Sequence, residues 1–232
     1  ISSVFGGVVI TNEEKIAEKI KKIEDIAPYP SYIWIYQQLL HPIITSLVLK
    51  GFSTNDYLGK YLLYVFKKIH MISKTVIEAD KATFLGKSKV KRYPNALAHL
   101  SFNQLFKINR FNKKRLHIYN VYKSRLSKLN IKLPENQAFF LRIPVLSYER
   151  KKMQLFFKRN SVYLGDWYSN IIDPKWTNLS EMLYKKGTCR KAEYIAERIV
   201  NLPSYPTMKN HDIEEVVRLM KKYYGKKRKA RS

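Results

Sequence analysis

The sequence has one cysteine, Cys189, among its 232 residues. A disulfide scaffold is therefore excluded, and no second cysteine is available for a zinc motif. A single cysteine suits a reducing setting, so we expect a cytoplasmic location. The histidines show no spacing typical of metal ligands, and we interpret all of them as structural: His41, His70, His99, His117 and His211. The sequence thus predicts no metal site.

Acidic residues are scarce, with 18 Asp and Glu against 44 Lys and Arg, for a formal net charge of +26. One explanation is an AT-rich genome, because Lys, Ile, Asn and Tyr are abundant together and the lysines are spread along the chain. The other is an anionic partner such as nucleic acid, acidic lipid or a phosphorylated ligand. The aromatic residues lie in apolar stripes, and no nucleic-acid-binding motif occurs. We therefore expect no nucleic-acid partner, and keep a basic nucleic-acid-binding or membrane-surface protein without enzymatic activity as the alternative.

Uninterrupted apolar runs of the length of a membrane span, about 20 residues, are also lacking. Residues 33–49 contain no Asp, Glu, Lys or Arg but are broken by Gln, His and Pro. A second apolar stretch, residues 57–72, places Lys60, Lys67 and Lys68 near one side of a helix, and residues 51–55 supply the turn. Residues 31–72 therefore predict a helical hairpin. The first alternative is that the hairpin is buried in the protein or in a dimer interface. The second is that it lies on a membrane surface with its lysines toward anionic headgroups, and the third is that it spans the membrane.

The opening residues predict a strand followed by a helix. Val8, Val9 and Ile10 read as a buried strand, and Thr11 or Asn12 reads as the cap of the helix that follows. Pro28 and Pro30 end this unit. We expect residues 1–30 to be the end of a large domain whose other strands are missing. We therefore expect the chain to be the C-terminal part of a larger protein.

The remaining chain divides into further segments. Residues 31–92 read as the hairpin followed by a basic loop, and residues 93–130 as one long connecting helix, or two with a break near 109–112. Residues 131–224 read as a small α/β domain in the order strand, helix, strand, loop, helix, strand, helix. Its strands are expected at 138–146, 162–164 and 200–203, and its helices at 148–158, 189–199 and 212–224. Residues 225–232 read as a basic disordered tail.

Four motifs in this order carry a family resemblance. They are Gly6–Glu14 with Ala17–Ile20, Arg92–Ala98 with Gln104 and Leu105, Leu164–Trp167, and Cys189–Pro203 with Asp212–Val216. Together they resemble the DegT/StrS-type sugar aminotransferases, which are pyridoxal-phosphate (PLP) enzymes of fold type I. The resemblance covers nearly the whole chain except residues 31–85. It implies an α/β fold class: the C-terminal portion of a fold type I PLP-dependent transferase, with a small α/β domain and a helical insertion.

The resemblance also implies a chemistry. In such families a lysine holds PLP as a Schiff base, a few residues before the glycine pair. Here that pair is Gly6 and Gly7, so the lysine is expected ahead of Ile1, together with the phosphate-binding and ring-stacking residues. We therefore predict that this chain contains no catalytic residue, that none of its lysines takes the role, and that it is inactive alone.

The resemblance transfers few site residues to this chain. Arg92 and Asn95 are the candidate cofactor-binding residues, because the family's loop before this helix reaches the neighbouring subunit's active site, and a guanidinium binds a phosphate bidentately. Val90 stands where the family often has Asn. Asp166 and Trp167 are the candidate substrate-binding residues of the sugar pocket. The alternatives are a surface arginine, a packed tryptophan and a capping aspartate.

The full enzyme is then expected to convert a nucleotide-linked keto sugar into an amino sugar in polysaccharide or glycan biosynthesis. Glutamate is the expected amino donor. The resemblance implies a homodimer with its sites at the subunit interface, and residues 31–72 add a possible peripheral membrane contact.

Overall fold

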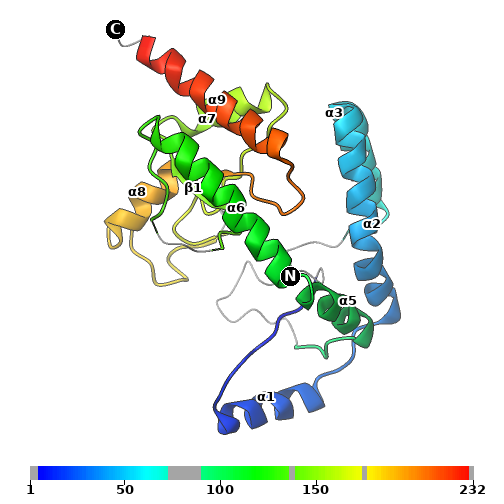
Figure 1. The fold of residues 1–232 in the computed structure, drawn as a ribbon. Helices are drawn as coiled ribbons and strands as arrows, with labels where there is room; N and C mark the ends of the chain where they lie inside the picture. The colour runs from blue at the N-terminus through cyan, green and yellow to red at the C-terminus, as the bar shows by residue number, and fades with distance from the viewer. Residues whose placement is uncertain (1–4, 73–89, 136–138, 174–176, 230–232) are drawn as a thin grey trace. The chain divides into compact units, whose positions relative to one another are not determined.

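The computed structural model describes residues 5–72, 90–135, 139–173 and 177–229. The chain forms two compact units, Ile1–Ile108 and Asn109–Ser232, and Figure 1 labels their helices and strands. Within the described ranges, no helix is long and apolar enough to cross a membrane. Most of the predicted basic loop at 73–92 lies outside the described residues.

The first unit begins with an irregular segment and helix α1, Glu14–Ile26. The predicted strand at Val8–Ile10 is wrong: these residues form no strand, and their side chains are 68–90% exposed. A strand needs a hydrogen-bonded neighbour, and none pairs with this segment in the described chain. The predicted cap also differs. Glu13 is the N-cap residue, and the Thr11 hydroxyl accepts a hydrogen bond from the Glu13 amide at 3.1 Å.

The predicted helical hairpin is present as α2, Tyr32–Thr54, and α3, Asp56–Lys68, which pack side by side (Figure 1). The expected five-residue turn is only one residue long, because α2 continues through Gly51 to Thr54. Asn55 makes the reversal, and its side-chain oxygen accepts hydrogen bonds from the amides of Tyr57 and Leu58. This double cap starts α3 directly after α2 ends.

The connecting region consists of two helices, α5, Asn95–Leu105, and α6, Ile108–Ser127. The alternative of two helices is therefore confirmed, although the break lies at residues 106–107, slightly before the expected position. Pro94 is the N-cap residue of α5, where its missing amide costs nothing. Leu97 of α5 is fully buried within the first unit.

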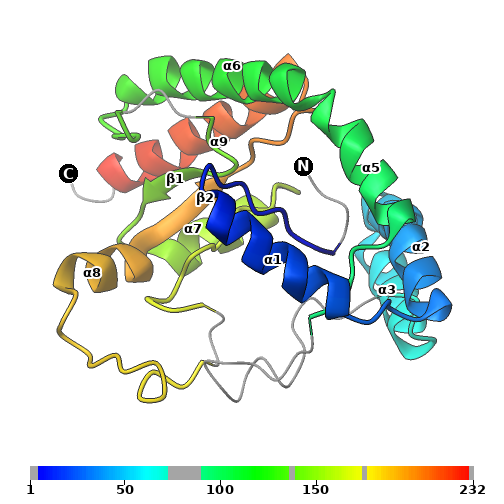
Figure 2. The same cartoon turned by 90° about the horizontal axis from the view of Figure 1, so that it is seen from below.

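The second unit holds the main hydrophobic core. Helix α6 and the last helix, α9, Asn210–Lys229, run alongside one another on one side of the sheet (Figure 2). Tyr119 and Tyr122 of α6 are fully buried, as are Leu219 and Met220 of α9. Burial of side chains this large stabilises a unit by about 1.5–3 kcal/mol each. Helix α7, Arg150–Lys158, adds Met153 and Phe157 to the same core.

The sheet of this unit has two antiparallel strands, β1, Ile143–Leu146, and β2, Ile199–Leu202. β2 follows directly after helix α8, Arg190–Arg198. Ile143 pairs with Leu202, and Pro144 pairs with Asn201 at the edge position that a proline tolerates. The expected strand at 138–146 is shorter, because Phe139 and Leu141 are exposed while Ile143 and Val145 are buried.

Two further expectations for this unit are corrected. The expected strand at 162–164 is absent from the described chain and is replaced by a single bridge between Gly165 and Asn201, with two backbone hydrogen bonds of 2.9 Å. The expected disordered tail from Gly225 is helical through Lys229. Lys and Arg are good helix formers and suit the negative C-terminal end of a helix, so one glycine does not end α9.

Candidate functional site

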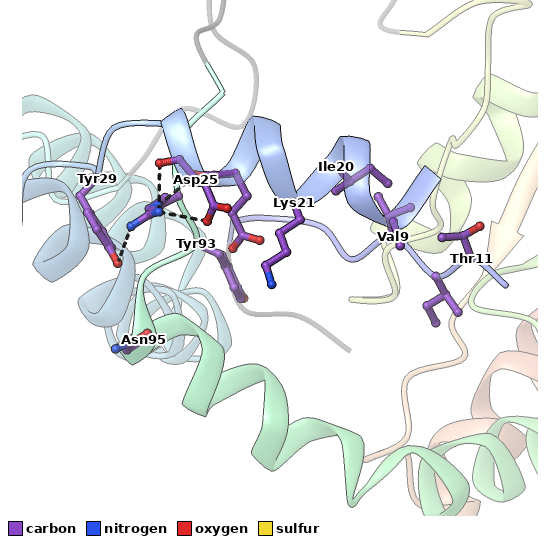
Figure 3. A pocket seen from close by; sticks show the side chains of 12 residues that line it. Val9, Thr11, Ile20, Lys21, Asp25, Tyr29, Tyr93 and Asn95 are labelled. Atoms are coloured by element: carbon purple, nitrogen blue, oxygen red, sulfur yellow. Dashed lines mark hydrogen bonds and ion pairs between the residues drawn. The ribbon is translucent and has the colours of Figure 1, made fainter. Parts of the chain in front are cut away.

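A cavity of about 680 Å³ lies in the first unit. Figure 3 shows its walls, built from the opening segment, α1 and the start of α5. The lining side chains are apolar at one end and charged or polar at the other: Val9, Ile10, Thr11, Ala17, Ile20, Lys21, Glu24, Asp25, Tyr29, Arg92, Tyr93 and Asn95. The two predicted cofactor-binding residues, Arg92 and Asn95, therefore belong to one cavity.

The guanidinium of Arg92 is held by the C-terminal end of α1. Its Nε donates to the carbonyl oxygen of Glu24 at 3.0 Å, and its Nη2 donates to the carbonyl oxygen of Asp25 at 3.0 Å. The same Nη2 lies 3.4 Å from the Asp25 carboxylate. The guanidinium also lies 5.2 Å from the centre of the Tyr29 ring. Arg92 thus adds donors to carbonyl groups at the end of α1, where the regular helical hydrogen bonds stop; the Glu24 oxygen also accepts from the Ala27 amide at 3.1 Å.

Among the polar side chains of the cavity, Lys21 and Asn95 can donate hydrogen bonds to a ligand. Figure 3 shows Lys21 pointing from α1 toward the side on which Tyr93 lies. Neither side chain forms a hydrogen bond or ion pair with another described residue. The charged end of the cavity also contains the carboxylates of Glu24 and Asp25, so its cations and anions are mixed.

The opening segment reaches the cavity by crossing the ring of Tyr93. Gly6 has a φ of +110°, and a Cβ placed there would lie 2.4 Å from Cε2 of Tyr93. Only glycine fits this position. The Tyr93 hydroxyl donates to the carbonyl oxygen of Leu97 at 3.2 Å, which fixes the ring to α5. The first glycine of the pair therefore has a structural role, whereas Gly7 has open space around it.

The donors and charges of this cavity, taken by themselves, do not fit a PLP phosphate. A PLP phosphate needs several donors, whereas the donors of Arg92 point to backbone oxygens of α1. The carboxylates of Glu24 and Asp25 would lie beside a phosphate and repel it. We therefore derive no catalytic step from this cavity. That Arg92 and Asn95 bind the cofactor stays a prediction.

The predicted substrate-binding residues, Asp166 and Trp167, lie in the second unit, in the loop after Gly165. The Trp167 amide donates to the side-chain oxygen of Asn201 at 2.9 Å, and Asn201 is 4% exposed. The loop is thereby attached to β2 through both backbone and side-chain hydrogen bonds. Trp167 is half exposed and Asp166 is partly buried. The structure does not bury Trp167 in the core.

Arg142 stacks on the Trp167 indole, with its guanidinium carbon 4.3 Å from the ring centre. Arg142 is exposed and forms no hydrogen bond or ion pair with any other described residue, and its Nη1 lies beside Gly165. An aromatic face beside a guanidinium suits a ring joined to a phosphate. We name Arg142 and Trp167 the Arg–Trp platform.

Sequence reasoning missed Arg142 and Asn201. Arg142 gives no signal, because an arginine beside a strand is common on protein surfaces. Asn201 does give one, since it is a polar residue between Val200 and Leu202 in a short apolar strand. A buried polar side chain needs a partner, and here that partner is the Trp167 amide. The sequence also gave no sign that Asp25 and Tyr29 hold Arg92.

The profile of the DegT/DnrJ/EryC1/StrS aminotransferase family matches residues 67–221. The match includes Arg92, Asn95, Asp166 and Trp167. A comparison with curated proteins finds no match.

Two solved structures share the fold. S. venezuelae DesV in complex with a ketimine intermediate is 17% identical with a TM-score of 0.51, and the match covers 61% of this chain and 40% of that one. A DegT DnrJ EryC1 StrS aminotransferase from Brucella abortus is 16% identical with a TM-score of 0.51, covering 74% of this chain and 44% of that one. This chain thus spans less than half the length of either structure. The expected α/β transferase fold class is confirmed, and the chain belongs to the DegT/DnrJ/EryC1/StrS aminotransferase family.

Proposed function

We propose that this chain works within a PLP-dependent aminotransferase that converts a nucleotide-linked keto sugar into an amino sugar. Glutamate is the proposed amino donor, and the proposed assembly is a homodimer with its active sites at the subunit interface. The proposed pathway is polysaccharide or glycan biosynthesis. The observation that carries the proposal is the family match over residues 67–221. This match does not favour the alternative of a basic nucleic-acid-binding protein.

The proposed role of this chain within the enzyme is recognition of the substrate. The Arg–Trp platform offers an indole face for a sugar or base ring, and guanidinium donors for a diphosphate. Asn201 holds the platform's loop on β2, so the geometry is set before the ligand arrives. Asp166, next to Trp167, is the proposed partner of sugar hydroxyl groups.

The proposed role of this chain does not include covalent attachment of the cofactor. PLP, when bound, supplies the electron sink for amino transfer, and it needs an amine at the position before the family's glycine pair. Residues 1–14 contain no lysine. We therefore propose that the chain alone does not catalyse transamination. We also propose a cytoplasmic location, which suits the one unpaired thiol, Cys189.

Ligand titration followed by NMR tests the substrate assignment. The purified chain is titrated with a nucleoside diphosphate sugar, the matching nucleoside monophosphate and the free sugar. We expect the indole signal of Trp167 to shift with the first ligand, and Trp167→Ala or Arg142→Ala to weaken binding about tenfold, or about 1.4 kcal/mol. Tyr32→Ala, which removes an exposed aromatic ring from α2, is the control. Equal binding by all variants, or no preference for the diphosphate sugar, would contradict the assignment.

A further inference from the structure

The outward side of α3 carries a regular row of tyrosines and lysines. We define the α3 tyrosine–lysine face as Tyr57, Lys60, Tyr61, Tyr64, Lys67 and Lys68. Their spacing of three and four residues puts them on one side of the helix. The three tyrosines are 62–82% exposed. Three large exposed rings on one side of a helix form a surface of the kind that binds another molecule.

The opposite side of α3 is fixed against α2. A Cβ at Gly59 would lie 2.3 Å from the Phe52 ring, and a Cβ at Gly51 would lie 2.8 Å from Leu62. The two helices therefore approach closely at these glycines, and α3 cannot rotate to bury its outer side without losing this contact. The hairpin presents the tyrosine–lysine face as a fixed feature of the first unit.

The charge of the hairpin has one sign. Between Tyr32 and Ile72, the only acidic residue is Asp56, against Lys50 and the three lysines of the face. Lys60 lies over the Tyr57 ring at 5.8 Å. None of the three lysines of the face forms an ion pair with a described residue. Asp56, four residues before Lys60, is thus the single carboxylate against four lysines in this stretch, and the hairpin keeps a net positive charge.

We propose that the α3 tyrosine–lysine face docks on an anionic lipid membrane surface. Tyrosines have an apolar ring and a polar tip and are enriched at the boundary between water and lipid. Lysines lay their alkyl chains along apolar surface and keep the ammonium group at the level of the headgroups. Each lysine near an anionic leaflet adds attraction. A second copy of this chain fits the face less well, because a two-fold contact would bring the lysine rows together.

Vesicle flotation of the full chain tests the proposal. Wild type is mixed with vesicles of phosphatidylcholine alone, and with vesicles of phosphatidylcholine and phosphatidylglycerol in equal parts. The test variant carries Lys60→Glu, Lys67→Glu and Lys68→Glu. The matched control carries Lys151→Glu, Lys185→Glu and Lys191→Glu, which change the net charge equally at exposed positions of the second unit. Circular dichroism and the solution mass are recorded for every protein.

We expect wild type and the control variant to float with the anionic vesicles and not with the neutral ones. The α3 variant is expected to bind the anionic vesicles at least about tenfold more weakly, because it loses three attractive charges and gains three repulsive ones. Equal weakening in both triple variants would show diffuse charge attraction and overturn the proposal. A wild type that binds neither vesicle, or both equally, would also overturn it.

A second variant keeps the test valid if the charge reversal disturbs folding. Tyr61→Ser with Tyr64→Ser removes the rings and leaves the charge unchanged, whereas Tyr61→Phe with Tyr64→Phe retains the rings. We expect the serine pair to weaken anionic-vesicle binding and the phenylalanine pair to retain it. Equal binding by both pairs would overturn the role of the rings. A change in solution mass in the serine pair alone would assign the face to a second copy and overturn the proposal.

Discussion

The guanidinium of Arg92 contacts Asp25 at two points. Its Nη2 donates to the backbone carbonyl oxygen at 3.0 Å and lies 3.4 Å from the carboxylate. The two residues are 67 positions apart in the sequence. This contact therefore joins the end of α1 to the segment that leads into α5. The Arg92 amide also donates to the carbonyl oxygen of Pro28 at 3.0 Å. The arginine that the family resemblance assigns to the cofactor therefore has a second, structural task.

Replacing Arg92 tests this structural task. Arg92→Ala removes hydrogen bonds to two carbonyl groups, and we expect it to lower the free energy of unfolding by about 1–2 kcal/mol, since a charged donor contributes about that much at a partly exposed site. Arg92→Lys keeps the positive charge but lacks the forked arrangement of donors. We therefore expect it to retain less than half of the stability that Arg92→Ala loses. Chemical denaturation measures both, and hydrogen exchange is expected to rise at the end of α1. Stability equal to wild type in both variants would show that the contact contributes nothing.

The glycine pair supplies a matched comparison. Gly6→Ala places a methyl group against the Tyr93 ring at a positive φ, and we expect a loss of about 1–2 kcal/mol. Gly7→Ala has open space and no such φ, so it is expected to be neutral or slightly stabilising. Melting temperatures of the two variants provide the measurement. Equal effects would mean that the opening segment does not rest on Tyr93.

The buried hydroxyl of Tyr122 donates to the carbonyl oxygen of Pro203 at 3.1 Å and links α6 to the residue after β2. Its burial raises the pKa of the phenol well above its ordinary value. Tyr122→Phe leaves that carbonyl without its donor, so we expect a cost of about 1–2 kcal/mol. Tyr32→Phe, at an exposed position, is expected to change stability by less than about 0.5 kcal/mol. If the two variants unfold at the same denaturant concentration, the hydrogen bond is not stabilising.

The pH dependence of the second unit has a source in Glu193 of α8. Its carboxylate accepts hydrogen bonds from the Tyr184 hydroxyl at 2.7 Å and from the Gly187 amide, and these lower its pKa below the ordinary 4.5. A carboxyl group with a lowered folded-state pKa stabilises the fold above its ordinary pKa, and this stability is lost as the pH falls through the folded-state value. Glu193→Gln is therefore expected to show a shallower loss of stability below pH 4.5 than wild type. Thermal melts over a pH series measure the slopes, and parallel slopes would refute the assignment.

Patterns of short range in the sequence predicted most helices correctly. The apolar stripes predicted α7 and α8 to within two residues, whereas α9 runs five residues beyond its predicted end. The proline positions correctly marked the start of α5. The predictions that depend on contacts between residues far apart in the sequence were wrong. Val8–Ile10 has the composition of a buried strand, but composition does not specify a neighbour. Gly165 pairs with Asn201 through one bridge instead of a strand, because Asn201 receives the loop through its side chain.

In the candidate site, too, residues of local motifs were predicted and their distant partners were not. Trp167 and Arg92 were found because each belongs to a local motif of the resemblance. Their partners, Arg142 and Asp25, were not found, because 25 and 67 residues of chain separate them from the motif residues. The close contact between Gly59 and Phe52 was likewise hidden, although the glycines of the hairpin mark positions where helices can approach.

Reductive trapping of PLP tests the central claim most directly. The chain is mixed with one equivalent of PLP, reduced with borohydride, and examined by intact-mass and peptide mass spectrometry. The account predicts only sparse adducts scattered over exposed lysines, because none of the lysines of this chain, Lys21 of the cavity included, is proposed to hold the cofactor. One lysine modified in nearly every molecule would contradict it and would place the missing amine within this chain.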